Sequence, residues 1–144
     1  MTISQTIKEI IENLPGYNFT FLSADKSEQN LFDDIVFPIA YLDFPIESND
    51  TLHKSGSLTA EYTIKILFGM KSELDWFTDK HETDCIEPMR NAARKFITAM
   101  QLDSRIKEVK SSKRLDVKNI FDVNMSGCIL TITFTVADAN SICV

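Results

Sequence analysis

The sequence predicts an α+β fold, in which a mostly antiparallel sheet of about five strands carries two helices on one face. Residues 58–70 alternate apolar and polar side chains, which is typical of a half-buried strand. Two other segments repeat apolar residues at three- and four-residue steps, which is typical of amphipathic helices. The order is helix, strand, long strand pair, long helix and strand pair, without an internal repeat. We therefore expect a single domain over residues 1–144.

The first predicted element is a short amphipathic helix over residues 3–14. Thr2 followed by Gln5 fits a capping box, in which each residue's side chain bonds the backbone N–H of the other. Pro15-Gly16 is expected to end the helix. Aromatic and polar residues then alternate over 17–21, which predicts a strand, and a polar loop follows it.

The middle of the chain predicts two long strands. Residues 35–44 are apolar at nearly every position, as in a strand covered on both faces, and Pro38 within it indicates a sheet edge or a bulge. The polar stretch 47–56 is expected to be a long connection before the alternating strand over 58–70. Because that strand exceeds the usual five or six residues, we expect the pair over 35–70 to project as an extended hairpin.

The main helix is expected to open at a second capping box, formed by Ser72 and Asp75. An apolar stripe at helical spacing runs over residues 85–100 and predicts a long helix lying on the sheet. Pro88 lacks an N–H and clashes with the preceding turn, so a kink or a break is expected near residues 86–87.

The last third of the chain predicts a hairpin. Apolar residues occupy odd positions over 115–125 and even positions over 128–136. A two-residue turn at Ser126-Gly127 would pair Met125 with Cys128 and place both apolar sets on the same side of the sheet. The sequence therefore predicts a turn at this glycine.

Composition excludes several classes of protein. The chain holds 15 Lys or Arg and 21 Asp or Glu, so its formal net charge is −6, which disfavours broad binding to nucleic acid or to an anionic membrane. No apolar run approaches the roughly 18 residues of a membrane span, and we expect no signal peptide. The three cysteines have no paired spacing, which favours reduced thiols in the cytoplasm, two of them in the core.

A search for catalytic, cofactor and metal residues assigns none. His81 and Cys85 lie four residues apart and could place two metal ligands on one helix face, but no second pair completes a site, and a solvated first helical turn is the favoured interpretation. His53 lies in a polar stretch and is expected to be solvated. The acidic clusters at Asp33-Asp34 and over residues 79–84 are more typical of a solubilising surface than of paired catalytic carboxylates.

Two charged or apolar segments suggest contacts with other chains. Residues 105–114 hold five of the 15 positive charges. They could contact phosphates, but they lack interleaved aromatic residues, and contact with the acidic surface of a neighbouring copy is favoured. The end of the sequence, 141–144, is apolar and could dock on this domain or on a partner.

The order of elements resembles the tail-terminator and tail-completion (neck) proteins of tailed bacteriophages and prophages. The segments that carry the resemblance are the amphipathic helix 3–14, the run FPIAYLDF at 37–44, the strand 62–68, the helix 87–96 and the closing strand 129–136. The resemblance implies a non-enzymatic virion assembly protein without a cofactor. It implies a homo-oligomeric ring, a hexamer being one candidate size, that caps the tail tube and joins it to the head.

Tail tube and head-completion proteins would then be the partners, first in the cytoplasm of the bacterial host and later in the virion. The net negative charge would suit a ring lumen through which DNA slides. Membrane and sequence-specific nucleic-acid binding are not expected. The alternatives are a small enzyme or ligand-binding α+β domain, or a regulatory interaction domain of prophage origin. The expected subunit or partner contacts are Asn49, Asp50, His53, Lys54, Arg105, Lys107, Lys110, Lys113, Arg114, Ile142 and Val144.

Overall fold

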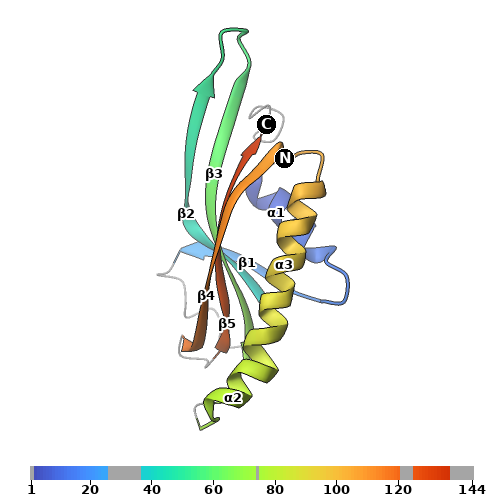
Figure 1. Cartoon of the computed structure of the whole chain (residues 1–144), viewed down its shortest axis with the longest axis vertical. Helices are drawn as coiled ribbons and strands as arrows, with labels where there is room; N and C mark the ends of the chain where they lie inside the picture. The colour runs from blue at the N-terminus through green and yellow to red at the C-terminus, as the bar shows by residue number, and fades with distance from the viewer. Residues whose placement is uncertain (1, 26–36, 74, 121–124, 137–144) are drawn as a thin grey trace.

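The computed structural model describes residues 2–25, 37–73, 75–120 and 125–136, and it confirms the α+β prediction (Figure 1). Its sheet has five strands in the order β1-β2-β3-β5-β4 and does not close into a barrel. β1 is parallel to β2, and every other pair is antiparallel. The elements are α1 (Ile3–Glu12), β1 (Thr20–Asp25), β2 (Ile39–Leu52), β3 (Leu58–Lys71), α2 (Thr78–His81), the π-turn η2 (Glu82–Ile86), α3 (Glu87–Leu102), β4 (Glu108–Ile120) and β5 (Met125–Val136).

The N-terminal helix has the predicted capping box. The backbone N–H of Gln5 donates to Thr2 Oγ1 at 3.1 Å, and the N–H of Thr2 donates to Gln5 Oε1 at 2.9 Å. The helix ends at Glu12, a turn before the predicted proline–glycine stop. The strand that follows begins at Thr20 rather than at residue 17, because its pairing with β2 starts at Thr20 opposite Ile39. The aromatic rings of Tyr17 and Phe19 stack on each other just before it.

β2 and β3 form the projecting hairpin that their length predicts (Figure 1). The predicted long polar connection over 47–56 is wrong, because β2 continues to Leu52 and pairs there with Leu58. The connection itself closes tightly, with the N–H of His53 bonded to the carbonyl of Ser57 at 2.9 Å. This polar segment therefore adopts a strand conformation because it pairs with β3, although its side chains are exposed.

The proline interpretation also needs correction. Pro38 lies just before β2 and accepts a hydrogen bond from Thr20, and β2 is an interior strand between β1 and β3. The bulge instead falls between Asp43 and Glu47, where the sheet register shifts around Pro45. A proline is tolerated there because the ladder is already interrupted.

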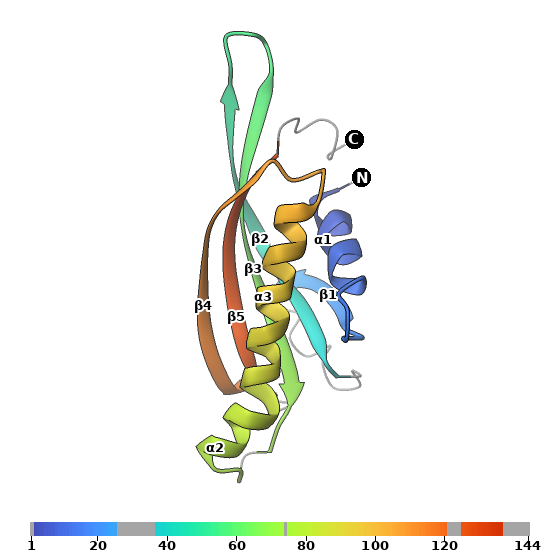
Figure 2. The same ribbon diagram turned by 45° about the vertical axis from the view of Figure 1, so that its right-hand side comes forward.

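Helices α1 and α3 lie on the same face of the sheet, as predicted (Figure 2). The even-numbered residues of β3 and β5 face them, which confirms the alternation read from β3. Phe68 packs on Phe96 of α3 and on Phe19, with ring centroids 5.9 and 5.4 Å apart. The large side chains buried in this core are Ile7, Ile11, Leu42, Ile64, Ile66, Phe68, Met89, Phe96, Met100, Leu130, Ile132 and Phe134.

The central helix does not open at the predicted second capping box. Ser72 is buried, and its hydroxyl lies 2.9 Å from Ser126 Oγ. The helix begins at Thr78, without a side-chain cap. The interruption expected near residues 86–87 is present as the π-turn that ends at Ile86, and Pro88, the second residue of α3, lies directly after it.

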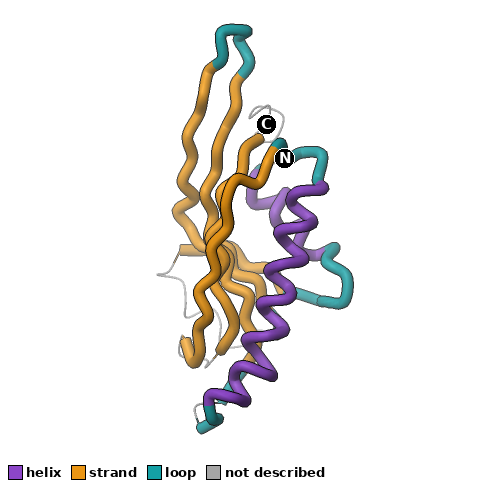
Figure 3. The backbone as a smooth tube through the Cα atoms, viewed as in Figure 1, coloured by secondary structure: helices purple, strands orange, loops and turns teal. Residues whose placement is uncertain are grey.

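The predicted turn at Ser126-Gly127 is wrong, since both residues lie inside β5. The strands are drawn in orange in Figure 3. Gly127 pairs with Val117 on one side and with Gly69 on the other. A Cβ at position 127 would overlap the carbonyl oxygen of Phe68. This glycine is therefore required by the close approach of two strands. The link between β4 and β5, 121–124, lies outside the described residues.

Candidate functional site

The distal part of the β2–β3 hairpin, residues 49–59, is called the arm here. It extends past the ends of α1 and α3 (Figure 1). The predicted contact residues Asn49, Asp50, His53 and Lys54 all lie on the arm and are exposed. The structure therefore brings these four residues together on one projection. His53 is exposed, as expected, and its Nε2 lies 2.8 Å from Thr59 Oγ1.

One face of the arm is apolar near its end. Leu52 is 74% exposed, and it sits directly across the ladder from Leu58, which is partly buried. Asp50 lies on the same face as Leu52, two residues back along β2. The arm thus presents an apolar end with a carboxylate beside it.

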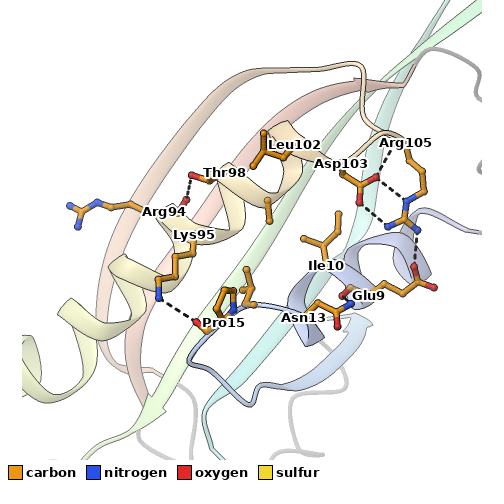
Figure 4. A pocket seen from close by; sticks show the side chains of 12 residues that line it. Glu9, Ile10, Asn13, Pro15, Arg94, Lys95, Thr98, Leu102, Asp103 and Arg105 are labelled. Carbon is orange, nitrogen blue, oxygen red and sulfur yellow. Dashed lines mark hydrogen bonds and ion pairs between the residues drawn. The ribbon is translucent and has the colours of Figure 1, made fainter.

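A groove between α1 and α3 is the second feature of the surface (Figure 4). We call it the helix groove, and its volume is about 540 Å³. Its apolar lining comes from Ile10 and Leu14 of the N-terminal helical segment and from Ala99 and Leu102 of α3. Leu102 is 80% exposed. The remaining lining residues are Glu9, Asn13, Pro15, Arg94, Lys95, Thr98, Asp103 and Arg105.

An ion-pair cluster closes one end of the helix groove. Arg105 donates to Glu9 Oε2 at 2.7 Å and, through a second nitrogen, to Asp103 Oδ2 at 2.8 Å. The hydrogen bond from Arg105 lowers the pKa of Asp103. At the other end Lys95 Nζ donates to the carbonyl of Pro15 at 3.2 Å (Figure 4). These contacts tie the N-terminal segment to α3 and to the residues that follow it.

The five cationic residues of the basic stretch 105–114 are divided between two ion pairs and an exposed group. Arg105 is engaged at the groove, and Lys110 pairs with Glu61 of β3 at 2.8 Å. The other three cationic residues are exposed on or just before the edge strand β4; they are Lys107, Lys113 and Arg114. Ile142 and Val144, the two predicted contacts near the end of the sequence, lie outside the described residues.

His81 and Cys85 are both buried, so the predicted solvated first turn is wrong for His81, whereas the other residues of that turn, 78–80, are exposed as predicted. His81 is 1% exposed, and its Nδ1 lies 3.1 Å from Ser126 Oγ. The Cys85 thiol donates to the carbonyl of Lys71 at 3.5 Å, and burial raises its pKa. The pair therefore joins the helix to the sheet. Within the described ranges, no three His, Cys, Asp or Glu side chains are grouped to hold a metal ion.

The other residues considered for chemistry are a buried cysteine and several acidic residues. Cys128 is buried beneath α3, and burial raises its pKa to about 12, so the prediction of two core thiols is confirmed for Cys85 and Cys128. The acidic residues Asp79, Glu82 and Asp84 are exposed on the helical surface. Asp33-Asp34 falls outside the described residues.

Sequence reasoning missed the helix groove and the apolar end of the arm. Two signals could have found them. Leu102 lies two residues past Met100, off the apolar stripe of its helix, and Leu52 is an isolated apolar residue in a polar stretch. Each is an apolar side chain at a place where the pattern predicts a polar one.

Comparison of the sequence with known protein families and with curated proteins finds no match. Among the helices of the described residues, none is long and apolar enough to span a bilayer.

Proposed function

We propose that the chain is a building block of an oligomeric assembly, a ring that caps a phage tail tube and joins it to the head. The observation that carries the proposal is the arm, which extends past the helices that cover the rest of the hairpin. Residues 49–57 are all exposed. A two-stranded ribbon is marginally stable alone in water, so contact with a partner would stabilise it.

The sheet offers further contact surface. β1 and β4 are its two edge strands, and β4 is exposed over residues 110–116. Lysine and arginine side chains on such an edge favour contact with an acidic neighbour, and the chain as a whole is acidic, at −6. Copies of this chain therefore have complementary charge to offer one another.

The phage assignment draws on the order of elements, which resembles tail-terminator and neck proteins. The described helices and strands follow that order along the chain. The acidic balance suits a passage for DNA, because it repels phosphate. Under this proposal the protein acts in the host cytoplasm during assembly and then in the virion, and it needs no cofactor.

The proposal is tested by measuring the mass of the oligomer and by electron microscopy of tubes mixed with the protein. The purified chain is expected to form a closed oligomer of one size, and to bind one end only of tubes polymerised from the tail tube protein encoded near its gene. Gold-labelled protein would mark that end, with an unrelated acidic protein of similar size as the control. Monomers at the highest attainable concentration, together with bare tube ends, would refute the proposed function.

A small ligand-binding domain is the second candidate. The helix groove favours it, because a volume of about 540 Å³ lies within the range of small-molecule sites. Native mass spectrometry of protein purified from its own host tests this candidate. A bound small molecule that is lost in Leu102→Glu would support it, and an unliganded mass in both proteins would count against it.

A further inference from the structure

Exposed apolar side chains mark two complementary surfaces. Among the described residues, four large apolar side chains are exposed: Leu52, Phe77, Leu102 and Leu115. Single exposed leucines are ordinary on a soluble protein. Leu52, however, stands on a projection, and Leu102 stands on the wall of a groove. A projection and a hollow with matching chemistry can bury each other.

We propose that the arm of one copy docks in the helix groove of a second copy. Leu52 and Leu58 would pack against Ile10 and Leu102, with Asp50 facing Arg94 of the second copy. This inference rests on the proposed function, for which it names the two surfaces that meet. The arm does not reach the helix groove of its own chain, from which it extends away (Figures 1 and 2), so the groove that it fills belongs to another copy.

The charges that would meet on the two surfaces are of opposite sign. Asp50 and Lys54 balance each other within the arm, and Glu47, in the strand leading into it, adds a negative charge. The charged lining of the helix groove is Arg94, Lys95 and Arg105 against Glu9 and Asp103, which leaves a positive balance. The Arg94 side chain is 55% exposed, with Glu87 Oε1 at 3.8 Å. Such rim charges steer association and select the partner, while the apolar contacts supply most of the affinity.

In the separate copies, the leucines of both surfaces are exposed to water, which is unfavourable for apolar side chains. Leu52 is 74% exposed and Leu102 is 80% exposed, and docking would remove both side chains from water. Ile10 and Leu14 form a floor that α1 and the turn after it hold in place through buried contacts with the core. The groove is therefore a preformed receptor, which lowers the entropy lost on docking.

The contact joins two different surfaces, so each pair still has one free arm and one free groove. Such head-to-tail contacts close into a ring when the rotation between neighbours allows it, and otherwise they continue as a filament. The proposed contact thus generates the kind of oligomer that the proposed function requires.

Charge reversal tests the pairing of Asp50 with Arg94. Asp50→Lys and Arg94→Glu are each expected to raise the dissociation constant of self-association about tenfold, because attraction becomes repulsion. The double variant is expected to return to within about threefold of the original value. Asp79→Lys, an exposed acid on α2, is the matched control and should change little. Sedimentation velocity over a concentration series measures the dissociation constant of self-association for the original protein and for all four variants.

Cross-linking tests the apolar contact. In a Cys143→Ser background the other two cysteines are buried, so Leu52→Cys with Leu102→Cys is expected to give covalent oligomers with a short bis-maleimide. Leu52→Cys with Phe77→Cys, at an exposed position just before α2, is the control and should give none. Equal cross-linking in both pairs, or cross-linking by Leu52→Cys alone, would overturn the inference.

The two proposals fail in distinguishable ways. If the chain assembles and caps tubes, but neither charge reversal nor the cysteine pair changes its behaviour, the arm-to-groove contact is wrong and the ring stands. If a small molecule copurifies in the helix groove and blocks the cross-link without changing assembly, the contact is wrong as well. A chain that stays monomeric, alone and with tubes, refutes both.

Discussion

Replacing Gly127 by alanine should destabilise the fold far more than a methyl group usually does. The residue lies in β5, with Gly69 of β3 directly opposite. An added Cβ would overlap the carbonyl oxygen of Phe68, and it would lie 3.0 Å from the carbonyl carbon of Phe68 and 3.1 Å from Gly69 Cα. All three atoms belong to backbone, so no side chain can rotate away.

The size of the effect follows from these contacts. The overlap with the carbonyl oxygen is the most severe of the three contacts. Non-bonded heavy atoms pack at about 3.5–4.0 Å, so β3 and β5 would have to separate by roughly an ångström or more. Overpacking of this kind typically costs about 1–3 kcal/mol, and each ladder hydrogen bond that is stretched beyond use adds about 1 kcal/mol. We expect a loss of about 3–5 kcal/mol, which is a large part of the 5–15 kcal/mol typical of a domain.

Urea unfolding followed by circular dichroism measures the loss. With a slope of about 2 kcal/mol per molar, the midpoint should fall by roughly 2 M. Gly69→Ala is the matched control, because its Cβ would meet the flexible Met125 side chain, with Sδ at 3.0 Å, and its effect should stay within about 1 kcal/mol. If Gly127→Ala loses no more stability than Gly69→Ala, the argument from strand approach is refuted.

Two further predictions concern titrating groups. Asp103→Asn should weaken the dependence of stability on acid pH. Arg105 lowers the pKa of Asp103 in the folded state, so their pairing stabilises the fold above the ordinary pKa of about 3.9. This stabilisation is lost as pH falls through the lower pKa of the folded state. Urea midpoints from pH 2 to 7 test this, and parallel profiles for the two proteins would contradict it. In a Cys143→Ser background, a thiol reagent at pH 8 should leave Cys85 and Cys128 unlabelled until urea unfolds the protein; rapid labelling of the folded protein would show that the thiols are accessible.

The sequence was sufficient where burial follows a strict period. The alternation along β3 places its even residues in the core, and the stripe on α3 places Met89, Phe96 and Met100 beneath the helix. Thr2 and Gln5 form their capping box because both partners lie within one helical turn. Such local patterns need no knowledge of the rest of the fold.

Prediction failed where a partner distant in sequence decides the structure. Ser72 has the spacing of a helix cap, but its hydroxyl bonds Ser126 across the sheet. Gly127 resembles a turn residue in the sequence, but a glycine is required at this position because the backbone of β3 approaches closely. Residues 47–51 are polar and resemble a loop, but pairing with β3 extends them. The helix groove was missed for the same reason, since α1 and α3 meet only in the folded chain.

The π-turn at Glu82–Ile86 has a consequence for insertions and deletions. A π-turn bonds each residue to the fifth one along, so it holds one residue more than an α-helical turn. It keeps His81, Cys85 and Met89 buried on one side at steps of four. Removing one residue from this turn would leave an ordinary α-helical turn, which covers nearly the same rotation with one residue fewer. The residues before it would keep their direction, so His81 would still face Ser126, and a one-codon deletion here is expected to be tolerated.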